Sequence, residues 1–446
     1  MPVAYNVRNL VQRKGTTLMT AVGIGLTVAV LVVAVALTVG LSSVFSGTGD
    51  ARQFLVLRKG TDAELSSTVS SETYQIVRRL PGIAKDESGE PMVSPEAITV
   101  VNLPNVDMAA DAETGMNVTV RGMTPIGYKM RPFELIDGRK AADGVREVIV
   151  GENVAKRYPA ARLGNEIRFG RGLWKVVGVF RSGETAANSE IWTDLNQLRG
   201  DFEQQGGSSS LLVRAEIDAP TAEKQIAAAN AATAKAKAER AAAVKAAVKS
   251  AMAKGETEIA AQAAAETAIP AATIYKADFI SNFKIQDDQR LNANVLAEKD
   301  YYAGMTMSGV PLMVLGYFVS VVMAVGSGFA ATNTMYAAVA RRGREIGTLR
   351  ALGFSRFSIL RSFVLESVCL ALLGGIVGVL IALPINGVTT GVGSFATFSE
   401  TAFKFKVGPM AIGIGLAFAA VIGALGGLLP AWAASRTSIV AAMREG

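Results

Sequence analysis

The chain has 446 residues, of which 50% are hydrophobic and 19% charged, and its formal net charge is +7. Its mean hydropathy of +0.32 is too high for an average soluble protein, whereas its charged fraction is too large for a chain buried wholly in lipid. It holds no histidine and a single cysteine, Cys369, which excludes histidine catalysis, histidine-ligated metals, intrachain disulfides and cysteine metal clusters. The composition therefore predicts membrane spans joined to one sizeable soluble domain.

Four uncharged runs, at residues 15–49, 301–340, 367–399 and 407–435, exceed the roughly 20 residues that a helix needs to cross a bilayer. The apolar core of the first run is longer than that of a typical signal peptide, and no clear small-residue cleavage site follows it, so we expect a retained span. The second run is too long for one crossing. We expect it to form a continuous helix that projects beyond the membrane.

Positive charges next to these runs predict the orientation. They precede the first run, separate the second from the third, and follow the fourth, which places them all on one side of a four-span topology; they are Arg8, Arg13, Lys14, Arg341, Arg342, Arg344, Arg350, Arg356, Arg361, Arg436 and Arg444. The positive-inside rule makes that side cytoplasmic, in the inner (cytoplasmic) membrane of the cell. The large segment between the first two runs is then extracytoplasmic.

These observations divide the chain into nine consecutive parts. We expect a cytoplasmic N-terminus (1–16), a first span (17–44), an extracytoplasmic domain (45–302), a second span (303–340), a cytoplasmic helix and loop (341–357), a third span (358–386), a short extracytoplasmic loop (387–408), a fourth span (409–435) and a cytoplasmic C-terminus (436–446).

The soluble domain divides into two portions with different secondary-structure patterns. Residues 54–60 read as a strand and 70–83 as a helix with a serine cap, and alternating β-branched runs follow, so we expect an α/β portion and then a mainly β portion. Trp174 and Trp192 are expected in its core. In residues 221–268, alanine fills 22 of 48 positions and alternates with Lys and Glu, which predicts a helical arm broken near "KGET". The arm is either a solvated spacer or a docking surface for a partner.

The loop between the second and third spans carries a helical pattern. Ile346, Leu349 and Leu352 recur at helical spacing, and Gly353 is a plausible C-terminal stop. A short amphipathic helix with arginines suits either docking into the groove of a partner or anchoring to the membrane surface. The pattern by itself leaves both interpretations open.

Residues 341–383 resemble the C-terminal domain of FtsX/MacB-type ABC transporter permeases. The resemblance rests on Arg-Glu-Ile-Gly at 344–347, Arg-Ala-Leu-Gly at 350–353, Glu366 and the glycine cluster at 374–378, and it continues in "GALGGLLPAWAASRTSIVAAMREG" at the C-terminus. The segment "GENVAKRYPAARLGNEIRFGRGLWKVVGVF" is similar to the MacB-type periplasmic core. The resemblance thus implies four transmembrane helices and a large α/β extracytoplasmic domain; the alanine-rich arm departs from the usual pattern.

The resemblance implies that 341–353 is a coupling helix seated in a cleft of a nucleotide-binding subunit. The residues it assigns to this coupling are Arg342, Gly343, Arg344, Glu345, Gly347, Arg350 and Gly353. Among these, the glycines would permit close approach, and Arg344, Glu345 and Arg350 would make polar contacts.

Four further residues concern the membrane part: Glu366, Gly374, Gly375 and Gly378. Glu366 lies just inside the third span, where a lone acid is either functional or paired with an arginine such as Arg361; we favour the pairing. The glycines allow close helix packing, either within the chain or with a second copy.

The resulting functional hypothesis is the permease subunit of an ABC transporter, itself not an enzyme and without a cofactor. No Walker A pattern (GxxxxGK[ST]) occurs in the sequence, so ATP and magnesium are expected in a partner ATPase. ATP hydrolysis would move the extracytoplasmic domain and so export or extract an amphipathic or lipophilic substrate. Expected partners are a second permease chain, identical or related, membrane lipids and a periplasmic adaptor. Binding to nucleic acid is not expected. The alternative is a regulator in which the same motion activates a cell-wall hydrolase or a sensor.

Overall fold

The computed structural model describes residues 14–106, 115–202, 206–393 and 398–436. The chain divides into two compact units. The helical unit is drawn from Met1–Ser43, Gly309–Gly391 and Phe403–Gly446, and the sheet unit from Val44–Ser308 and Val392–Ala402. The charged residues Arg8, Arg13 and Arg444, on which part of the predicted orientation rests, lie outside the described residues.

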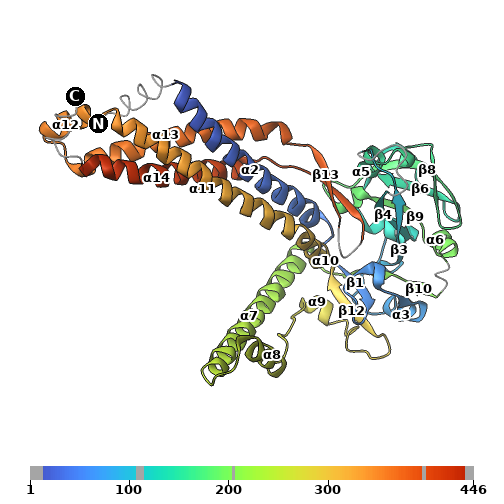
Figure 1. The fold of residues 1–446 in the computed structure, drawn as a ribbon. Helices are drawn as coiled ribbons and strands as arrows, with labels where there is room; N and C mark the ends of the chain where they lie inside the picture. The colour runs from blue at the N-terminus through green and yellow to red at the C-terminus, as the bar shows by residue number, and fades with distance from the viewer. Residues whose placement is uncertain (1–13, 107–114, 203–205, 394–397, 437–446) are drawn as a thin grey trace. The chain divides into compact units, whose positions relative to one another are not determined.

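The sheet unit is built on one mixed sheet of ten strands (Figure 1). Along the sheet the order is β12-β1-β11-β3-β4-β9-β6-β8-β5, with β7 paired to β8. The strands are β1 (Gln53–Arg58), β3 (Val93–Leu103), β4 (Met116–Met123), β5 (Glu134–Gly138), β6 (Glu147–Gly151), β7 (Glu166–Phe169), β8 (Gly172–Arg181), β9 (Glu190–Asp194), β11 (Ser210–Arg214) and β12 (Ala293–Ala297). The pairs β4–β9 and β6–β8 are parallel, and the other pairs are antiparallel. A small second ladder pairs β2 (Val69–Ser70) with β10 (Gly207–Ser208).

Short helices pack against this sheet. They are α3 (Ser71–Val77), α4 (Pro125–Met130), α5 (Glu152–Arg157), α6 (Leu195–Asp201), α9 (Asp278–Ser281) and α10 (Glu298–Met305), with 3₁₀ turns at Glu64–Ser66, Pro159–Ala161 and Ala186–Ser189. The serine cap predicted for the first of these helices is confirmed, because the Ser70 hydroxyl accepts a hydrogen bond from the Thr73 N–H at 3.1 Å. The helix ends at Val77 and is therefore shorter than the predicted range of 70–83.

The sheet unit contains two large hydrophobic cores. One lies around β1, β11 and β12 and contains Phe54 and Val213; the other lies around β4, β6 and β8 and contains Trp174 and Val150. The sequence predicted an α/β portion followed by a mainly β portion, and the structure joins the two in one sheet through the pairing of β11 with β3. Trp174 and Trp192 have no solvent exposure, which confirms that they are core residues.

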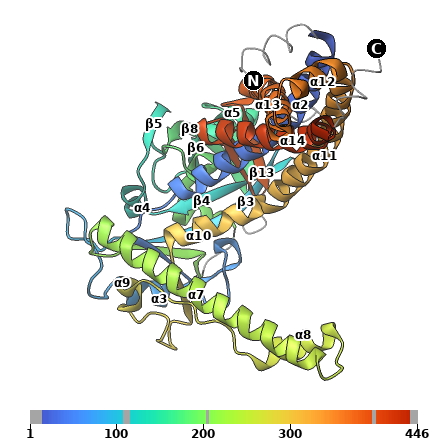
Figure 2. The ribbon, with the colours of Figure 1, turned by 90° about the vertical axis from the view of Figure 1, so that its left-hand side faces the viewer.

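The alanine-rich segment forms two helices, α7 (Ala219–Met252) and α8 (Glu258–Ala268). The Asp218 side chain caps α7 by accepting a hydrogen bond from the Thr221 N–H at 2.9 Å. Between the helices, Gly255 has a φ of +93°, a conformation that suits glycine and permits the turn. Figure 2 shows α8 against the far end of α7, where Val244 and Val248 meet alanines of α8.

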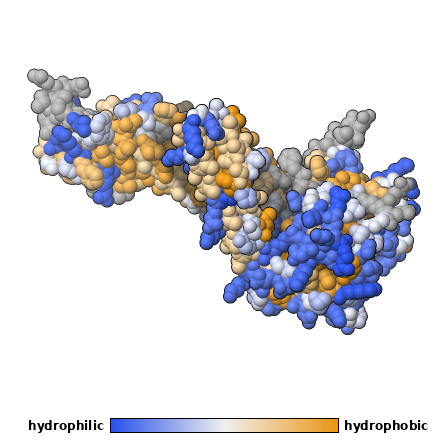
Figure 3. Space-filling model, turned by 90° about the horizontal axis from the view of Figure 1, so that it is seen from below, coloured by the Kyte–Doolittle hydropathy of each residue, from blue (hydrophilic) through white to orange (hydrophobic). Residues whose placement is uncertain are grey.

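The helical unit contains the four helices that are long and apolar enough to cross a membrane, within the described residues. The helices of this unit are α2 (Lys14–Gly47), α11 (Val310–Ala340), α12 (Gly343–Ala351), α13 (Arg356–Ala382) and α14 (Pro409–Arg436), and a 3₁₀ turn at Leu383–Ile385 follows α13. Strands β13 (Thr389–Gly393) and β14 (Glu400–Lys404) form a hairpin between α13 and α14. Figure 3 shows hydrophobic residues over the surface of this unit and hydrophilic ones over the sheet unit. Together with the α/β domain, these helices confirm the expected fold class.

The continuous helix expected over the second apolar run is interrupted. A 3₁₀ turn at Thr306–Gly309 separates α10 from α11. Pro311 lies in the first turn of α11 and has no N–H to continue a helical hydrogen-bond ladder from the preceding residues. The chain therefore enters α11 through a change of helix type.

Glycines bring helices of the bundle into backbone contact. A Cβ built on Gly378 of α13 would lie 2.3 Å from the Gly25 carbonyl oxygen of α2, and one on Gly374 would lie 2.7 Å from the Ala21 oxygen. Gly375 faces α14 in the same way, 2.9 Å from the Ala419 Cβ. These three glycines, singled out from the sequence, thus lie at helix contacts within one chain.

We expect Gly378→Leu to lower the thermal unfolding midpoint of the detergent-purified chain, because a side chain there cannot fit without separating α2 from α13. Overpacking of this kind costs about 1–3 kcal/mol. The matched control is Gly413→Leu on α14, where a Cβ has nothing within 4 Å. Equal midpoints for the two variants would contradict the packing role of Gly378.

Candidate functional site

The short helix α12 is held to the helical unit by its buried side. Ile346 is 2% exposed and packs with Met335, Ile359 and Phe363. At its end, the Gly353 N–H donates to the Arg350 carbonyl and the Phe354 N–H donates to the Leu349 carbonyl, both at 3.1 Å. With Gly353 at φ +92°, this is a Schellman motif, so the predicted glycine stop is confirmed.

The other side of α12 is open. Arg344 and Glu345 are exposed, and at the end of the helix the exposed fraction of Leu352 is 73% and that of Phe357, in the first turn of α13, is 71%. Leu352, predicted to share an apolar stripe with Ile346, therefore faces outward. The exposed surface of α12 and its junction with α13 thus combines charged side chains with large apolar ones.

Three further residues assigned to coupling differ in their burial and contacts. Gly343 is half-buried with open space at its Cβ position, whereas Gly347 is buried on the side of Ile346. Arg350 donates from Nη1 to the Ser435 carbonyl oxygen at 3.1 Å, which joins α12 to the end of α14.

Arg342 faces inward rather than outward. Its Nη1 donates to Glu366 Oε2 at 2.8 Å, and both side chains are less than 9% exposed. The predicted pairing of Glu366 with an arginine is confirmed in kind, but the partner is Arg342 and not Arg361, because Arg361 is exposed on another face of α13. The ion pair ties the start of α12 to the body of the third span.

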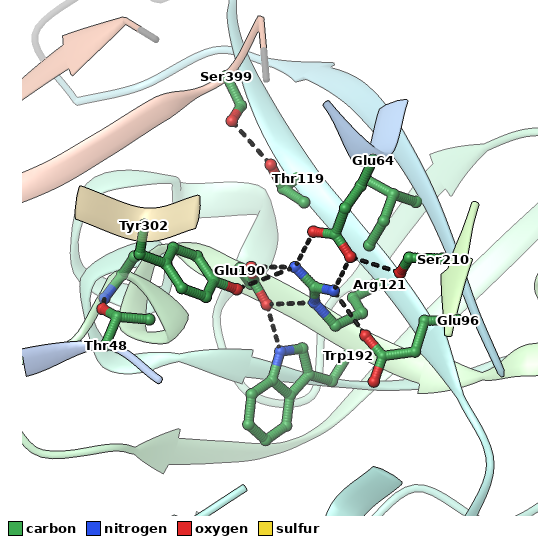
Figure 4. Close-up of polar contacts among 12 residues, drawn as sticks. Thr48, Glu64, Glu96, Thr119, Arg121, Glu190, Trp192, Ser210, Tyr302 and Ser399 are labelled. Carbon is green, nitrogen blue, oxygen red and sulfur yellow. Dashed lines mark hydrogen bonds and ion pairs between the residues drawn. The ribbon is translucent and has the colours of Figure 1, made fainter. Parts of the chain in front are cut away.

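In the sheet unit, the tip of the hairpin between α13 and α14 is bonded to the sheet and its helices. The Glu400 carboxylate pairs with Arg157 at 2.5 Å and accepts a hydrogen bond from the Tyr158 hydroxyl. Thr119 on β4 donates to the Ser399 hydroxyl at 2.7 Å, as Figure 4 shows. The short loop 387–408, which the sequence left without a role, thus contributes Ser399 and Glu400 to buried polar contacts within the sheet unit.

A buried ionic cluster lies beside this contact. Arg121 is 2% exposed and bonds three carboxylates, from Glu64, Glu96 and Glu190 (Figure 4). Burial disfavours the charged guanidinium, yet Glu190 and Glu64 hold the pKa of Arg121 well above its ordinary value. The cluster joins a 3₁₀ turn, β3, β4 and β9 at one point.

Two further residues extend the cluster. Arg131 donates to Glu96 from both terminal nitrogens, and the Trp192 indole N–H donates to Glu190 at 2.7 Å. Because the residues of the cluster lie up to 128 positions apart in the chain, no local sequence pattern identifies them. The only signal available was a charged residue, Arg121, inside the alternating run "MNVTVRGM".

A cavity of about 330 Å³ opens next to the cluster, within the sheet unit. Its wall includes Arg131, Glu190, Tyr302 and the buried Glu298 at the start of α10. Burial raises the pKa of Glu298 to about 7, although Arg131 and the Asp50 N–H act in the opposite direction. Among the described residues, no group of three or more metal-ligating side chains is placed to hold a metal.

Two family models match the chain. Residues 17–229 match the MacB-like periplasmic core domain, and residues 317–439 match the FtsX-like permease C-terminal domain. These two matched domains, together with the membrane-spanning helices, place the chain in the class of ABC transporter permeases. Within that class, the chain belongs to the FtsX/MacB-type family.

Curated relatives are similar over part of the chain. It is 32% identical over 172 residues to the macrolide export ATP-binding/permease protein MacB of Nitrobacter winogradskyi, which is 39% of this chain and 22% of that protein. It is 33% identical over 158 residues to the pyoverdine export ATP-binding/permease protein PvdT of Pseudomonas savastanoi pv. phaseolicola, which is 35% of this chain and 22% of that protein. The match thus spans about a fifth of the length of these relatives.

Solved structures are also similar to the chain. One is the extracellular domain of the noncanonic ABC-type transporter YknZ from Gram-positive bacteria, with 18% identity, a TM-score of 0.28, and coverage of 40% of this chain and 91% of that one. Another is the periplasmic region of MacB from Actinobacillus actinomycetemcomitans, with 14% identity, a TM-score of 0.28, and coverage of 39% and 79%.

We expect Arg121→Met to destabilise the sheet unit by about 3–5 kcal/mol, because it leaves three buried carboxylates without their shared cation. Tryptophan fluorescence of the full chain during thermal unfolding measures this, since the Trp192 indole hydrogen-bonds to Glu190. Arg139→Met serves as the control: Arg139 pairs with Glu147, but its side chain is 58% exposed. A fluorescence midpoint as high for Arg121→Met as for Arg139→Met would show that the cluster does not stabilise the fold.

Proposed function

We propose that the chain is the permease component of an ABC exporter, driven by an ATP-binding component that lies outside this sequence. The observation that carries the proposal is α12, a helix between two membrane-spanning helices that exposes charged side chains and is followed by exposed apolar ones at its junction with α13. It lies within the residues that match the FtsX-like permease domain. A short helix of this kind presents few, closely spaced contacts to a groove in a partner.

In this proposal the two sides of α12 have different tasks. Arg344 and Glu345, on the exposed side, contact the ATPase, and Gly343 leaves room for close approach. Ile346 and the Arg342–Glu366 ion pair hold the inner side to the bundle. Because a buried ion pair with good geometry resists separation, a force applied to α12 passes into α11 and α13.

We propose that this motion reaches the sheet unit through three chain connections. The first is the passage from α2 into β1, and the second is the passage from α10 into α11. The third is the hairpin between α13 and α14, whose tip is bonded through Ser399 and Glu400. Mechanotransmission through these connections would move the sheet unit without a substrate path along the helices.

The assembly follows from these roles. We propose an inner-membrane location with the sheet unit outside the cytoplasm, ATP and magnesium bound by the partner ATPase, and a dimer of permease chains. The cargo would be amphipathic or lipophilic, and a periplasmic adaptor would receive it. Support for export comes from the relatives, which are named as macrolide and pyoverdine export proteins.

We expect Glu345→Lys to reduce the amount of ABC-type ATPase that co-purifies with the tagged chain at least tenfold, because it reverses a charge on the exposed side of α12. Mild-detergent purification from the native membrane, followed by mass spectrometry, measures this. Glu258→Lys on α8 is the matched control, since Glu258 is also an exposed glutamate in the first turn of a helix. If both variants retain the ATPase equally, α12 is not the docking helix.

We expect Glu400→Gln to leave ATPase binding unchanged but to abolish the stimulation of ATP hydrolysis by transported substrate. The change removes the carboxylate charge that neutralises Arg157 and so loosens the hairpin tip from the sheet unit. Steady-state ATP hydrolysis by the purified complex, with and without substrate, is the measurement. Glu134→Gln is the control, because Glu134 is 68% exposed on β5. Full stimulation in Glu400→Gln would remove the hairpin from the transmission route.

A further inference from the structure

The cavity beside the Arg121 cluster lies next to the segment that joins α2 to β1 and next to the start of α10. Its wall comes from Gly47–Gln53, which follows α2, from Met130–Pro132, from the 3₁₀ turn at Ala186–Ser189, and from the first turns of α7 and α10. At about 330 Å³, the cavity is within the size range of small-molecule sites in proteins.

Most charges in this wall are neutralised by partners. The pairs, with their distances, are Asp50 with Arg52 at 2.5 Å and with Arg214 at 3.6 Å, Arg131 with Glu96, Glu190 with Arg121 at 2.9 Å, and Glu223 with Lys299 at 2.8 Å. These pairs leave little free charge of either sign for a ligand to meet.

Glu298 differs from the other charged residues. Its side chain is buried, with an exposed fraction of 3%, and it forms no ion pair within 4 Å among the described residues. Its Oε2 accepts one hydrogen bond, from the Asp50 N–H at 2.9 Å, and its Oε1 has no hydrogen-bond partner in the described part of the chain. A buried carboxylate with so few partners carries a large desolvation cost, which a cation in the cavity would offset.

The rest of the wall is suited to an organic group. Met130, Pro132, Ala187 and Ala219 contribute apolar surface, and the Tyr302 ring lies on the same wall. A metal ion would require several oxygen ligands converging on one point, whereas here a single carboxylate is unpaired. An anion would meet the Glu298 carboxylate in a wall whose cations, Arg52, Arg131 and Lys299, are already paired with carboxylates.

We propose that this cavity binds a small amphipathic molecule that carries a protonated amine, with the ammonium group against Glu298 and the apolar part against the Met130–Pro132 and Ala187 surfaces. The ammonium donates a hydrogen bond to the free Oε1 and neutralises the carboxylate. Because the cavity borders both the segment that joins α2 to β1 and the start of α10, the ligand contacts these two segments at once. The binding itself does not depend on the ATPase coupling proposed above.

The test uses the full chain in phosphatidylcholine nanodiscs and two fluorescent probes. Dansylcadaverine carries a primary ammonium, and N-pentyl dansylamide has the same ring and a neutral tail. We expect the wild type to bind dansylcadaverine at least tenfold more tightly than N-pentyl dansylamide, after subtraction of empty nanodiscs. Glu298→Gln should weaken dansylcadaverine binding at least tenfold and leave N-pentyl dansylamide unchanged, because Gln keeps an acceptor for the Asp50 N–H but has no charge.

Two further variants make the result specific. Glu258→Gln, on α8 and outside the cavity wall, should bind both probes as the wild type does. Ala187→Leu should weaken both probes by filling the cavity. Equal affinity of wild type and Glu298→Gln for dansylcadaverine would overturn the proposal. If Glu298→Gln fails to fold, a folded Ala187→Leu variant with wild-type affinity for dansylcadaverine would overturn it as well.

The protonation of Glu298 also predicts how the affinity of the cavity for an ammonium ligand changes with pH. Burial raises the pKa of Glu298, and the negative charge of Glu96 raises it further. The groups that favour the ionised carboxylate are Arg131, Arg121, Arg214 and the Asp50 N–H. With a pKa of about 7, the carboxyl is mostly protonated at pH 6 and mostly ionised at pH 8. Dansylcadaverine stays protonated over this range, so its affinity should rise about tenfold from pH 6 to pH 8. In Glu298→Gln the affinity should not change over this range, and a similar rise there would assign the titration to another group.

Discussion

The burial of Arg121 is the constraint on which the sheet unit depends. A guanidinium buried inside a protein carries a large desolvation cost unless carboxylates compensate its charge, and here Glu64, Glu96 and Glu190 do so from three different elements. Each of these elements must therefore be in place before the charge is neutralised. The cluster thus joins β3, β4 and β9, and this region also provides Thr119 to the hairpin contact and Glu190 to the wall of the Glu298 cavity.

The helical unit is stabilised mainly by close helix packing rather than by a buried ionic cluster. Its helices approach through small residues, and Gly374 and Gly378 allow α13 to touch the α2 backbone. The Arg342–Glu366 pair adds one charged contact near the end of the bundle that carries α12. Close packing and a buried ion pair both oppose small relative displacements, which is the property that the proposed transmission of force from α12 requires.

The two sides of α12 show how a short amphipathic helix serves two surfaces. Ile346 and Arg342 fix it to the bundle, and this leaves Arg344, Glu345 and Leu352 outward. The Schellman motif at Gly353 ends the helix before α13 begins, so the position of the exposed residues is set by backbone hydrogen bonds. A contact made on the outer side is thereby connected to the spans on either side of it.

The sequence by itself determined the features that depend on local composition. Long uncharged runs predicted the spans, alternation predicted strands such as β4, and Ser70 and Gly353 marked helix ends, because each of these signals acts over a few residues. Only the tertiary structure decided that Glu366 pairs with Arg342, that Ser399 and Glu400 bond to the sheet unit, that α10 and α11 are separated by a 3₁₀ turn, and that Glu298 is buried at a cavity. Most of these are contacts between residues distant in the chain. Their partners are selected by the packing of whole elements, which no local pattern encodes.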